Sequence, residues 1–537
     1  MEMRRAGKVF ATLLAVGVCA SAHAQSLAPP RVLVMPFENV PRDGRIFWIT
    51  EAAAVLITDD LNALGVAAIT RAERQQAFDR LQVPPAAALT DATVIRIGQL
   101  VGAGQVVVGS LRLDGETIVV RARSIALESG RMQSDVTDRG PLPELFAIFE
   151  RIARRIAPPS TKTSAEVEGQ HPPIAVFEDY IKGLLAETPA TAVNYLTAAL
   201  SRQPTFDRAR LALWEVYAEQ GDHGHALAAA EAVPSNSPMA RRAMFLAGLS
   251  QIQLKKYDDA LATFRTLLDA QSTPTVLNNL GVVQLRRGGT PQNGGEPTSY
   301  FKKAAEADPD DPDYLFNLGY ASWQNRDPQA AIYWLREAVR RNPADGDAHF
   351  VLAAALAAGG KASEAARERD LARRLSAAYE ASRRPGGETV PRGLERVKNQ
   401  VELPHARIEA RLATSEQRDQ EEVATFHLDR GRRLFQQESD REALVELNHA
   451  LYLSPYRAEA HLLVGRIHLR NGRIADAIGA LKVALWSAET AEAHAVLGEA
   501  YRQSKDFEAA RAEAERALSL DPASVEAKQL FARLDSR

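Results

Sequence analysis

The stretch "PDDPDYLFNLGYASWQNRDPQAAIYWLREAVRRNP", from Pro309 to Pro343, contains one complete unit of a repeated pattern. The words "AAEADP" and "AVRRNP" end at its two prolines, which are 34 positions apart. A fixed period of this length indicates a stack of helix pairs. The small residues Gly319 and Ala331 would let the two helices of the unit pack closely, and Pro343 would end the second helix because proline cannot continue one.

The same marks recur along the chain. A Leu-Gly pair occurs at Leu280-Gly281, Leu318-Gly319 and Leu497-Gly498, and an alanine follows the small position by twelve residues at Ala260, Ala331, Ala443, Ala477 and Ala510. In these marks the chain resembles the tetratricopeptide repeat family. The resemblance implies an all-α solenoid in two arrays: about six repeats in residues 172–375, and about three repeats with a capping helix in 424–537. Residues 376–423, rich in proline and charge, are expected to be a linker.

Residues 31–157 predict a separate domain with a mixed sheet and helices, of the α+β class. Strands are expected at Arg31–Phe37 and Val66–Thr70, and Asp114-Gly115 predicts the turn of a hairpin between two Val- and Ile-rich runs. A further strand is expected at 131–136, and helices at 46–64, 71–81, 91–101 and 142–156. The words "VLVMPFENV" and "VGAGQVVVGSLRLDGETIVVRARSIALESGRM" are similar to the amino-terminal domain of TolB and related bacterial envelope proteins. The resemblance implies an envelope docking domain, without TolB's β-propeller.

The first residues predict export. Met1–Lys8 is basic and Val9–Ala20 is apolar but too short to span a bilayer, so we expect a signal peptide over 1–24, cleaved after Ala24. The single cysteine, Cys19, lies in this segment, so the mature chain would contain no thiol. The predicted location is the periplasm or another exported compartment.

Charge and motifs argue against several classes of function. The 537 residues contain 65 Lys and Arg against 68 Asp and Glu, a net charge of -3, which gives no field for nucleic acid. The sequence contains no His-Glu-x-x-His, no phosphate loop and no Gly-x-Ser-x-Gly, and Gly102-x-Gly104 precedes a strand rather than opening a helix. We therefore expect no enzyme, no catalytic residue and no cofactor.

Histidines recur four residues before the small position of their unit, at His349, His427, His461 and His494. Metal ligands must converge within ~2 Å of one ion, whereas equivalent positions in successive units are at least a helix diameter, ~10 Å, apart. These histidines are therefore expected to pack within helix pairs, and no metal site is predicted.

The inner face of array 1 is expected to be apolar and to bind a partner. Its residues are Phe245, Leu249, Ile252, Val282, Leu285, Phe316, Tyr320 and Trp323. Spacings of four and three place Phe316, Tyr320 and Trp323 on one helix face, where all three can meet one ligand. We expect a groove for an apolar or amphipathic segment, either from a partner or from this chain's own linker. The alternative is that these side chains pack between neighbouring units.

The inner face of array 2 is expected to be basic, with Arg432, Arg466, Arg470 and Arg502. Arginine donates two parallel hydrogen bonds to a carboxylate, which favours a partner with an acidic tail or a C-terminal carboxylate. The alternative is pairing within the array, with Glu459, Glu492 and Glu499.

Together these features predict an exported, non-catalytic adaptor that binds proteins or peptide segments in the cell envelope, with peripheral envelope association and no transmembrane segment. Two alternatives stay open. One is a regulatory or accessory subunit of an envelope enzyme or of a secretion or assembly system. The other is a glycan-binding envelope protein, for which Tyr320 with Trp323 would be the aromatic platform.

Overall fold

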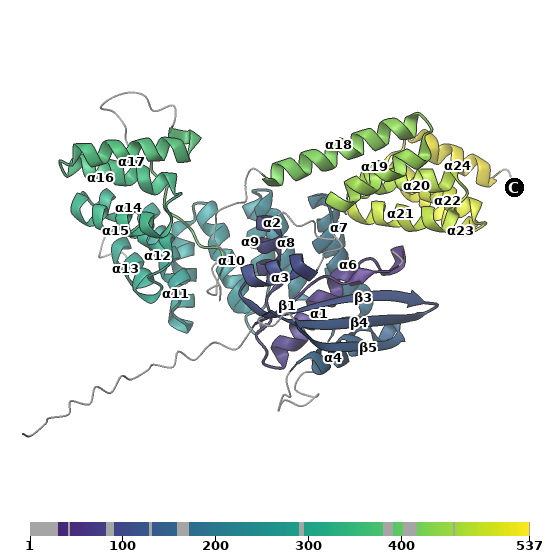
Figure 1. The fold of residues 1–537 in the computed structure, drawn as a ribbon, viewed down its shortest axis with the longest axis horizontal. Coiled ribbons are helices and arrows are strands. Elements are labelled where there is room, and N and C mark those ends of the chain that lie inside the picture. Colours follow the sequence, from purple (N-terminus) through teal and green to yellow (C-terminus); the bar gives the residue numbers. More distant parts are fainter. Residues whose placement is uncertain are drawn as a thin grey trace, which may run out of the picture.

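The computed structural model describes residues 31–40, 43–81, 91–127, 131–157, 171–288, 295–379, 390–400, 416–454 and 457–535 (Figure 1). The predicted signal peptide lies outside these residues, as do residues 380–389 and 401–415 of the predicted linker.

The amino-terminal domain contains a five-stranded mixed sheet. Strands β1 (Arg31–Val34) and β2 (Glu38–Asn39) both pair in parallel with β3 (Ala103–Asp114). Strand β4 (Thr117–Ala126) pairs antiparallel with β3 on one side and with β5 (Arg131–Pro141) on the other. The predicted class of this domain is confirmed.

Helices cover both faces of the sheet. Helices α1 (Ile49–Ala63) and α4 (Leu145–Ile156) pack on one face, in a core with Val32 and Val34. The opposite face, with Leu33, packs against α2 (Arg71–Leu81) and α3 (Asp91–Leu100). This alternation of neighbouring side chains follows from the two-residue period of a strand.

The strand expected at Val66–Thr70 is wrong. This stretch makes one isolated bridge, between Ala68 and Val32. The N–H of Ala68 donates to Oδ1 of Asn62, at 3.0 Å, so a side chain takes the hydrogen bond that a further ladder partner would take. A β-rich composition was therefore not enough to extend the sheet.

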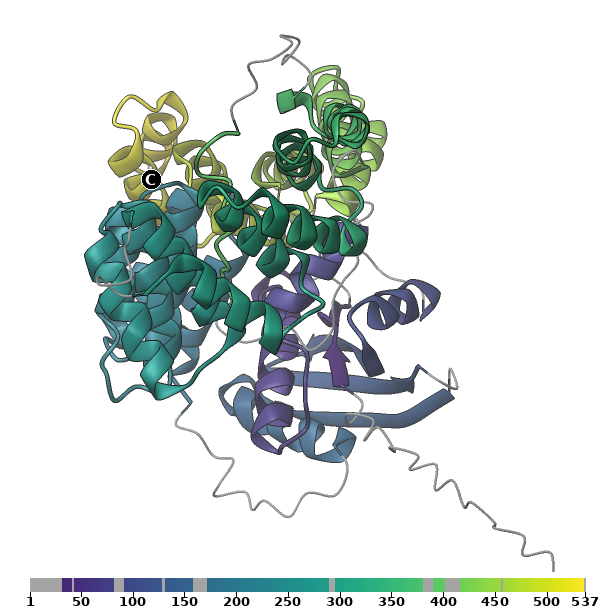
Figure 2. The same ribbon diagram turned by 90° about the vertical axis from the view of Figure 1, so that its left-hand side faces the viewer.

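Residues after 171 form helix pairs in two arrays (Figures 1 and 2). Array 1 consists of α6 (Ile174–Leu185), α7 (Pro189–Arg202), α8 (Asp207–Glu219), α9 (His223–Glu231), α10 (Ala240–Gln253), α11 (Tyr257–Ala270), α12 (Pro274–Arg287), α13 (Pro297–Ala307), α14 (Pro312–Gln324), α15 (Pro328–Arg341), α16 (Gly346–Ala358) and α17 (Ala362–Leu375). Array 2 consists of α18 (Glu416–Gln436), α19 (Asp440–Leu453), α20 (Ala458–Arg470), α21 (Ile474–Ser487), α22 (Ala491–Gln503), α23 (Phe507–Leu520) and α24 (Val525–Asp535).

Close contacts within each pair explain the small residues of the repeat. A Cβ added to Gly319 of α14 would lie 2.7 Å from Cγ of Leu335 on α15, and one added to Gly465 would lie 2.5 Å from Cγ of Leu481. Ala331, one turn before Leu335 on α15, is fully buried. Any larger side chain at these positions would push the two helices apart.

Array 2 turns back toward the amino-terminal domain rather than continuing the stack of array 1 (Figures 1 and 2). Val483 of α21 belongs to the same core cluster as the sheet and α1. A Cβ added to Gly44 would lie 2.9 Å from Cα of Gly479 in α21. The first repeat of array 1 also takes part, because the N–H of Glu187 donates to the carbonyl of Ser487 at 3.1 Å.

Candidate functional site

A segment that follows array 1 in sequence lies back across that array. Residues Val390 to Gln400, here called the groove segment, contain no helix or strand. They contact α12, α14 and the N-cap of α16, across about 50 to 120 positions of sequence. We call this contacted surface of array 1 the groove.

Buried asparagines hold the backbone of the groove segment. Asn317 of α14 donates from Nδ2 to the carbonyl of Arg396, at 2.8 Å, and accepts the N–H of Arg396 at 2.7 Å. Asn279 of α12 pairs with Lys398 in the same two-way manner, at 2.8 and 2.9 Å. Both asparagines are 0% exposed. Two alternate residues of the segment are thus held through peptide groups, as in the addition of a strand to a sheet.

A third asparagine connects the two helices below the segment. Asn278 of α12 donates from Nδ2 to the carbonyl of Arg396 at 2.9 Å, and its Oδ1 accepts a hydrogen bond from Asn317 at 2.7 Å. Every peptide carries the groups that these asparagines contact, so the contacts specify an extended backbone rather than a particular side chain.

Charged side chains of the segment pair with the groove. Arg396 lies 2.7 Å from Asp313 and 2.5 Å from Asp345, and Lys398 lies 2.9 Å from Asp311 and 2.6 Å from Asp313. Burial acts to raise the pKa of Asp313, but Lys398 and Arg396 outweigh it and hold that pKa below its usual value. The carboxylate is therefore stabilised in its ionised form by the segment itself.

Aromatic and apolar side chains complete the contact. The guanidinium of Arg396 stacks over Phe316, 3.9 Å from the ring centroid, and the hydroxyl of Tyr320 donates to the carbonyl of Pro391 at 2.7 Å. Val390 and Leu394 pack into the core cluster that contains both rings. Gly393 has φ +88°, a left-handed conformation that allows the segment to bend before Leu394.

The structure divides the residues predicted for the inner face of array 1. Phe316 and Tyr320 contact the groove segment, and Trp323 borders the same cluster. Leu285 is partly buried beside it. The others, Phe245, Leu249, Ile252 and Val282, are buried in the cores of their repeats.

Sequence reasoning missed the asparagines, although a signal was present. Asn279 and Asn317 each lie two residues before the glycine of their unit, Gly281 and Gly319. Asparagine is disfavoured inside helices because its side chain competes for backbone hydrogen bonds. Its recurrence at one position of the repeat therefore indicated a polar function there.

The arginines predicted for the inner face of array 2 lie beside carboxylates of that array. Arg432 pairs with Glu459 at 2.6 Å, Arg466 with Glu492 at 2.6 Å, Arg470 with Asp440 at 3.0 Å, and Arg502 with Glu499 at 2.7 Å. This is the alternative in which the arginines are neutralised within the array. A role in binding an acidic partner stays a prediction.

Three of the recurring histidines bridge the helices of their own unit. Each Nδ1 pairs with a glutamate 19 residues later: His349 with Glu368 at 2.6 Å, His427 with Glu446 at 2.7 Å, and His494 with Glu513 at 2.6 Å. His461 instead makes an edge-on ring contact with Phe47 of the amino-terminal domain, with ring centroids 6.4 Å apart.

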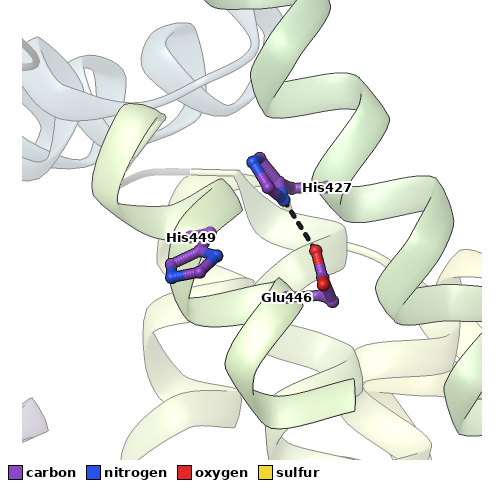
Figure 3. Close-up of side chains that lie close together, drawn as sticks. All are labelled: His427, Glu446 and His449. Carbon is purple, nitrogen blue, oxygen red and sulfur yellow. Dashed lines mark hydrogen bonds and ion pairs between the residues drawn. The ribbon is translucent and has the colours of Figure 1, made fainter. Parts of the chain in front are cut away.

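A second histidine joins one of these pairs. Ligand atoms of His427, Glu446 and His449 lie within 4.8 Å of one another, a group that could hold a metal ion (Figure 3). His449 lies on α19, the second helix of the pair, and so is not among the equivalent positions of successive units. Arg430 also pairs with Glu446, at 3.3 Å, and a cation there competes with a metal ion for the carboxylate.

A hollow of about 240 Å³ lies at the junction of the amino-terminal domain and array 1. Its lining includes Arg71 and Arg208. Arg71 pairs with Glu51 at 2.8 Å, and Arg208 pairs with Asp59, so arginines from two helices meet carboxylates of α1. The pair of Arg208 with Asp59 connects the domain with array 1, and Arg71 adds a hydrogen bond from its Nη2 to the carbonyl of Leu184 on α6, at 3.1 Å.

Family models described as "Tetratricopeptide repeat" match residues 216–276, 245–289, 299–346, 428–490 and 491–524. The chain contains tetratricopeptide repeats. Among solved structures, it is similar to YrrB, titled "a TPR protein with an unusual peptide-binding site", with 17% identity over 34% of this chain and 92% of that one and a TM-score of 0.28. It is also similar to PilF of Pseudomonas aeruginosa, with 18% identity over 38% and 96% of the two chains and a TM-score of 0.33. MamA of Desulfovibrio magneticus RS-1 is 16% identical over 32% and 96%, with a TM-score of 0.29.

A search of the curated proteins gave no match. None of the helices that the structure describes is long and apolar enough to cross a membrane.

Proposed function

We propose that this protein is an exported scaffold whose first tetratricopeptide array binds an extended peptide segment of a partner protein. The observation that carries the proposal is the pair of two-way contacts that Asn279 and Asn317 make with the backbone of the groove segment. A partner segment offers the same backbone groups and can therefore take the same place. The tetratricopeptide repeats support the proposal, because they suggest a protein-binding scaffold.

A binding role agrees with the chemistry of the groove. Its buried polar groups, Asn278, Asn279 and Asn317, are engaged with peptide groups and with one another. Held in this way they fix a backbone in place. We therefore favour a scaffold over an enzyme, and over a glycan-binding protein, because the ring of Tyr320 is covered by the groove segment rather than open to a sugar.

The proposed location in the cell envelope is supported by the sequence. Export is inferred from the basic and apolar residues before Ala24, and envelope docking from the resemblance of residues 31–137 to the amino-terminal domain of TolB. In this proposal the amino-terminal domain places the scaffold in the envelope, and array 1 recruits the partner.

Binding of a peptide in trans tests the proposal. In a full-length variant, residues 390–400 are replaced by alternating Gly and Ser, which keeps the chain length and removes the side chains of the groove segment. A labelled peptide with the sequence VPRGLERVKNQ, residues 390–400, is then titrated by fluorescence anisotropy. The peptide should bind this variant and bind the wild type much more weakly, because a tethered segment competes at an effective concentration on the order of millimolar.

Two further variants complete the test. Asn279→Ala with Asn317→Ala, introduced into the Gly-Ser variant, should abolish peptide binding. Asn325→Ala is the matched control, since Asn325 is exposed at the end of the same helix α14. A well-folded Gly-Ser variant that fails to bind the peptide would show that array 1 is not a peptide-binding site.

A further inference from the structure

The proposed function leaves open which segment the groove accepts, and the side-chain contacts of the groove segment answer this. We propose that the groove is specific for the order acidic residue, arginine, apolar residue, lysine, of which Glu395 to Lys398 is a built-in copy. The inference rests on the proposed function, because it describes the ligand of the same site. It also differs from the acidic partner expected from the arginines of array 2.

The alternation of an extended chain separates these four residues into two sets. Arg396 and Lys398, two positions apart, both reach the carboxylates of Asp311, Asp313 and Asp345. Glu395 pairs with Arg286 of α12, at 2.5 Å. Val397 packs against the apolar clusters of the neighbouring repeats. Because successive side chains of an extended chain point to opposite sides, a shift by one residue would bring every side chain to the wrong set of partners.

Two of the three carboxylates are held in place by the helices themselves. Asp311 is the N-cap of α14 and accepts the N–H of Asp313 at 2.9 Å. Asp345 is the N-cap of α16 and accepts the N–H of Ala348 at 3.0 Å. Each cap has one oxygen committed to its helix, so the carboxylate is already oriented when a cation arrives. The groove is in this sense prepared for positive charge.

Burial makes this charge pattern selective. Asp345 is 7% exposed and Glu395 is 6% exposed. A buried charge that loses its partner is costly, so a segment without cations would leave carboxylates of the groove unpaired. A basic residue in place of Glu395 would likewise face Arg286. The groove should therefore reject neutral and acidic segments, and segments with the charges in the reverse order.

The position of Arg396 should favour arginine over lysine. Its guanidinium reaches Asp313 and Asp345 and also stacks over Phe316. The flat fork of arginine can make two ion pairs and a ring contact together, whereas the ammonium of lysine acts as one compact charge. Lys398 also pairs with two carboxylates, those of Asp311 and Asp313, and lies over the ring of Tyr314, 5.1 Å from its centroid. Its two carboxylate partners lie close together at the start of α14, where one compact charge can reach both.

Peptide variants titrated into the Gly-Ser variant of the full chain test the specificity. The peptide with Arg396→Glu and Lys398→Glu should bind at least ~100-fold more weakly than the native peptide, since truncation of one buried ion-pair partner alone often has this effect. Arg396→Lys should weaken binding by roughly tenfold, through the lost fork and ring contact. Arg392→Glu is the matched control on the same peptide, because Arg392 is exposed, and it should leave the affinity nearly unchanged.

The outcomes separate the two proposals. The peptide with Arg396→Glu and Lys398→Glu is here called the reversed peptide. Weak binding of this peptide, together with normal binding of the Arg392→Glu peptide, supports the specificity. Equal affinities for the native and reversed peptides would show that the groove recognises backbone alone, which overturns the specificity and leaves the proposed function standing. If the Arg392→Glu peptide loses as much affinity as the reversed peptide, net charge rather than order decides, and the specificity is also overturned. If the native peptide does not bind, the proposed function itself fails.

Discussion

Substitution of Asn317 by alanine should open the groove without unfolding the repeat. The change removes the hydrogen bonds at 2.8 and 2.7 Å between this side chain and Arg396, and the one at 2.7 Å to Asn278. The carbonyl of Arg396 keeps its bond from Asn278, but the N–H of Arg396 and Oδ1 of Asn278 lose their partner. Each buried polar group left without a partner costs about 1–3 kcal/mol, so the loss of both partners should hold the groove segment about 2–6 kcal/mol less tightly.

Hydrogen exchange measured by mass spectrometry reports this loss directly. Exchange of the groove segment requires its opening, so 3 kcal/mol corresponds to roughly 150-fold faster exchange in peptides that cover residues 394–400. Helices α6 and α7, whose core residues belong to the cluster of the amino-terminal sheet, should keep their protection. The main thermal transition should shift little, because Asn317 does not contribute to the apolar core of its repeat.

Asn325→Ala provides the comparison, with the same substitution at an exposed position at the end of the same helix. It should leave exchange of the groove segment at the wild-type rate. Unchanged exchange in Asn317→Ala would refute the reasoning, because the asparagine contacts would then add nothing to the holding of the segment.

Three further expectations concern other parts of the molecule. Burial and neighbouring carboxylates raise the pKa of Asp60 to about 7, so the ionised form is disfavoured in the folded state and stability should fall as pH rises from about 4 to 7. Asp60→Asn should therefore raise the free energy of unfolding at pH 8 by up to about 4 kcal/mol, and with it the melting temperature. The gain should shrink toward pH 5, and an equal gain at both pH values would contradict this. Ala331→Trp should overpack its helix contact and lower the free energy of unfolding by about 1–3 kcal/mol. Gln329→Trp, at an exposed position of the same helix, should be tolerated. Equal melting curves for the two variants would show that the predicted helix register is wrong. His427→Ala should lower stability by about 1–2 kcal/mol through the loss of its glutamate pair. His449→Ala should lower it by under about 0.5 kcal/mol. A rise in melting temperature on addition of Zn²⁺ that requires both histidines would instead reveal a metal site.

The repeats could be predicted because close packing restricts residue type at fixed spacings. The approach of Leu335 to Gly319 leaves no room for a Cβ, and the same constraint appears in the sequence as a glycine at the equivalent positions 248, 281, 431 and 465. The same regularity placed Phe316 and Tyr320 on one face of their helix. Physical constraints that act within one helix pair are therefore visible in the sequence.

The occupant of the groove could not be predicted in the same way. Arg396 and Asp313 are 83 positions apart, and nothing local to either residue indicates that they meet. The segment has no periodicity, because its structure comes from the groove rather than from its own backbone. The stretch 66–70 likewise forms only one bridge to β1, at Val32, and its composition alone did not indicate how far the pairing extends.

Array 2 is attached to the rest of the chain in two ways: α21 packs against the amino-terminal domain, with Gly479 beside Gly44, and the groove segment precedes the array. One depends on shape, because a single methyl group on Gly44 would act as a wedge against the backbone of α21. The other depends on sequence, because the groove segment precedes array 2 in the chain and anchors it to array 1. Two attachments in one chain reinforce each other, since the release of one leaves the other to hold the parts at high effective concentration. Array 2 would therefore behave as a bivalently tethered module, and a partner that displaces the groove segment would loosen it without setting it free.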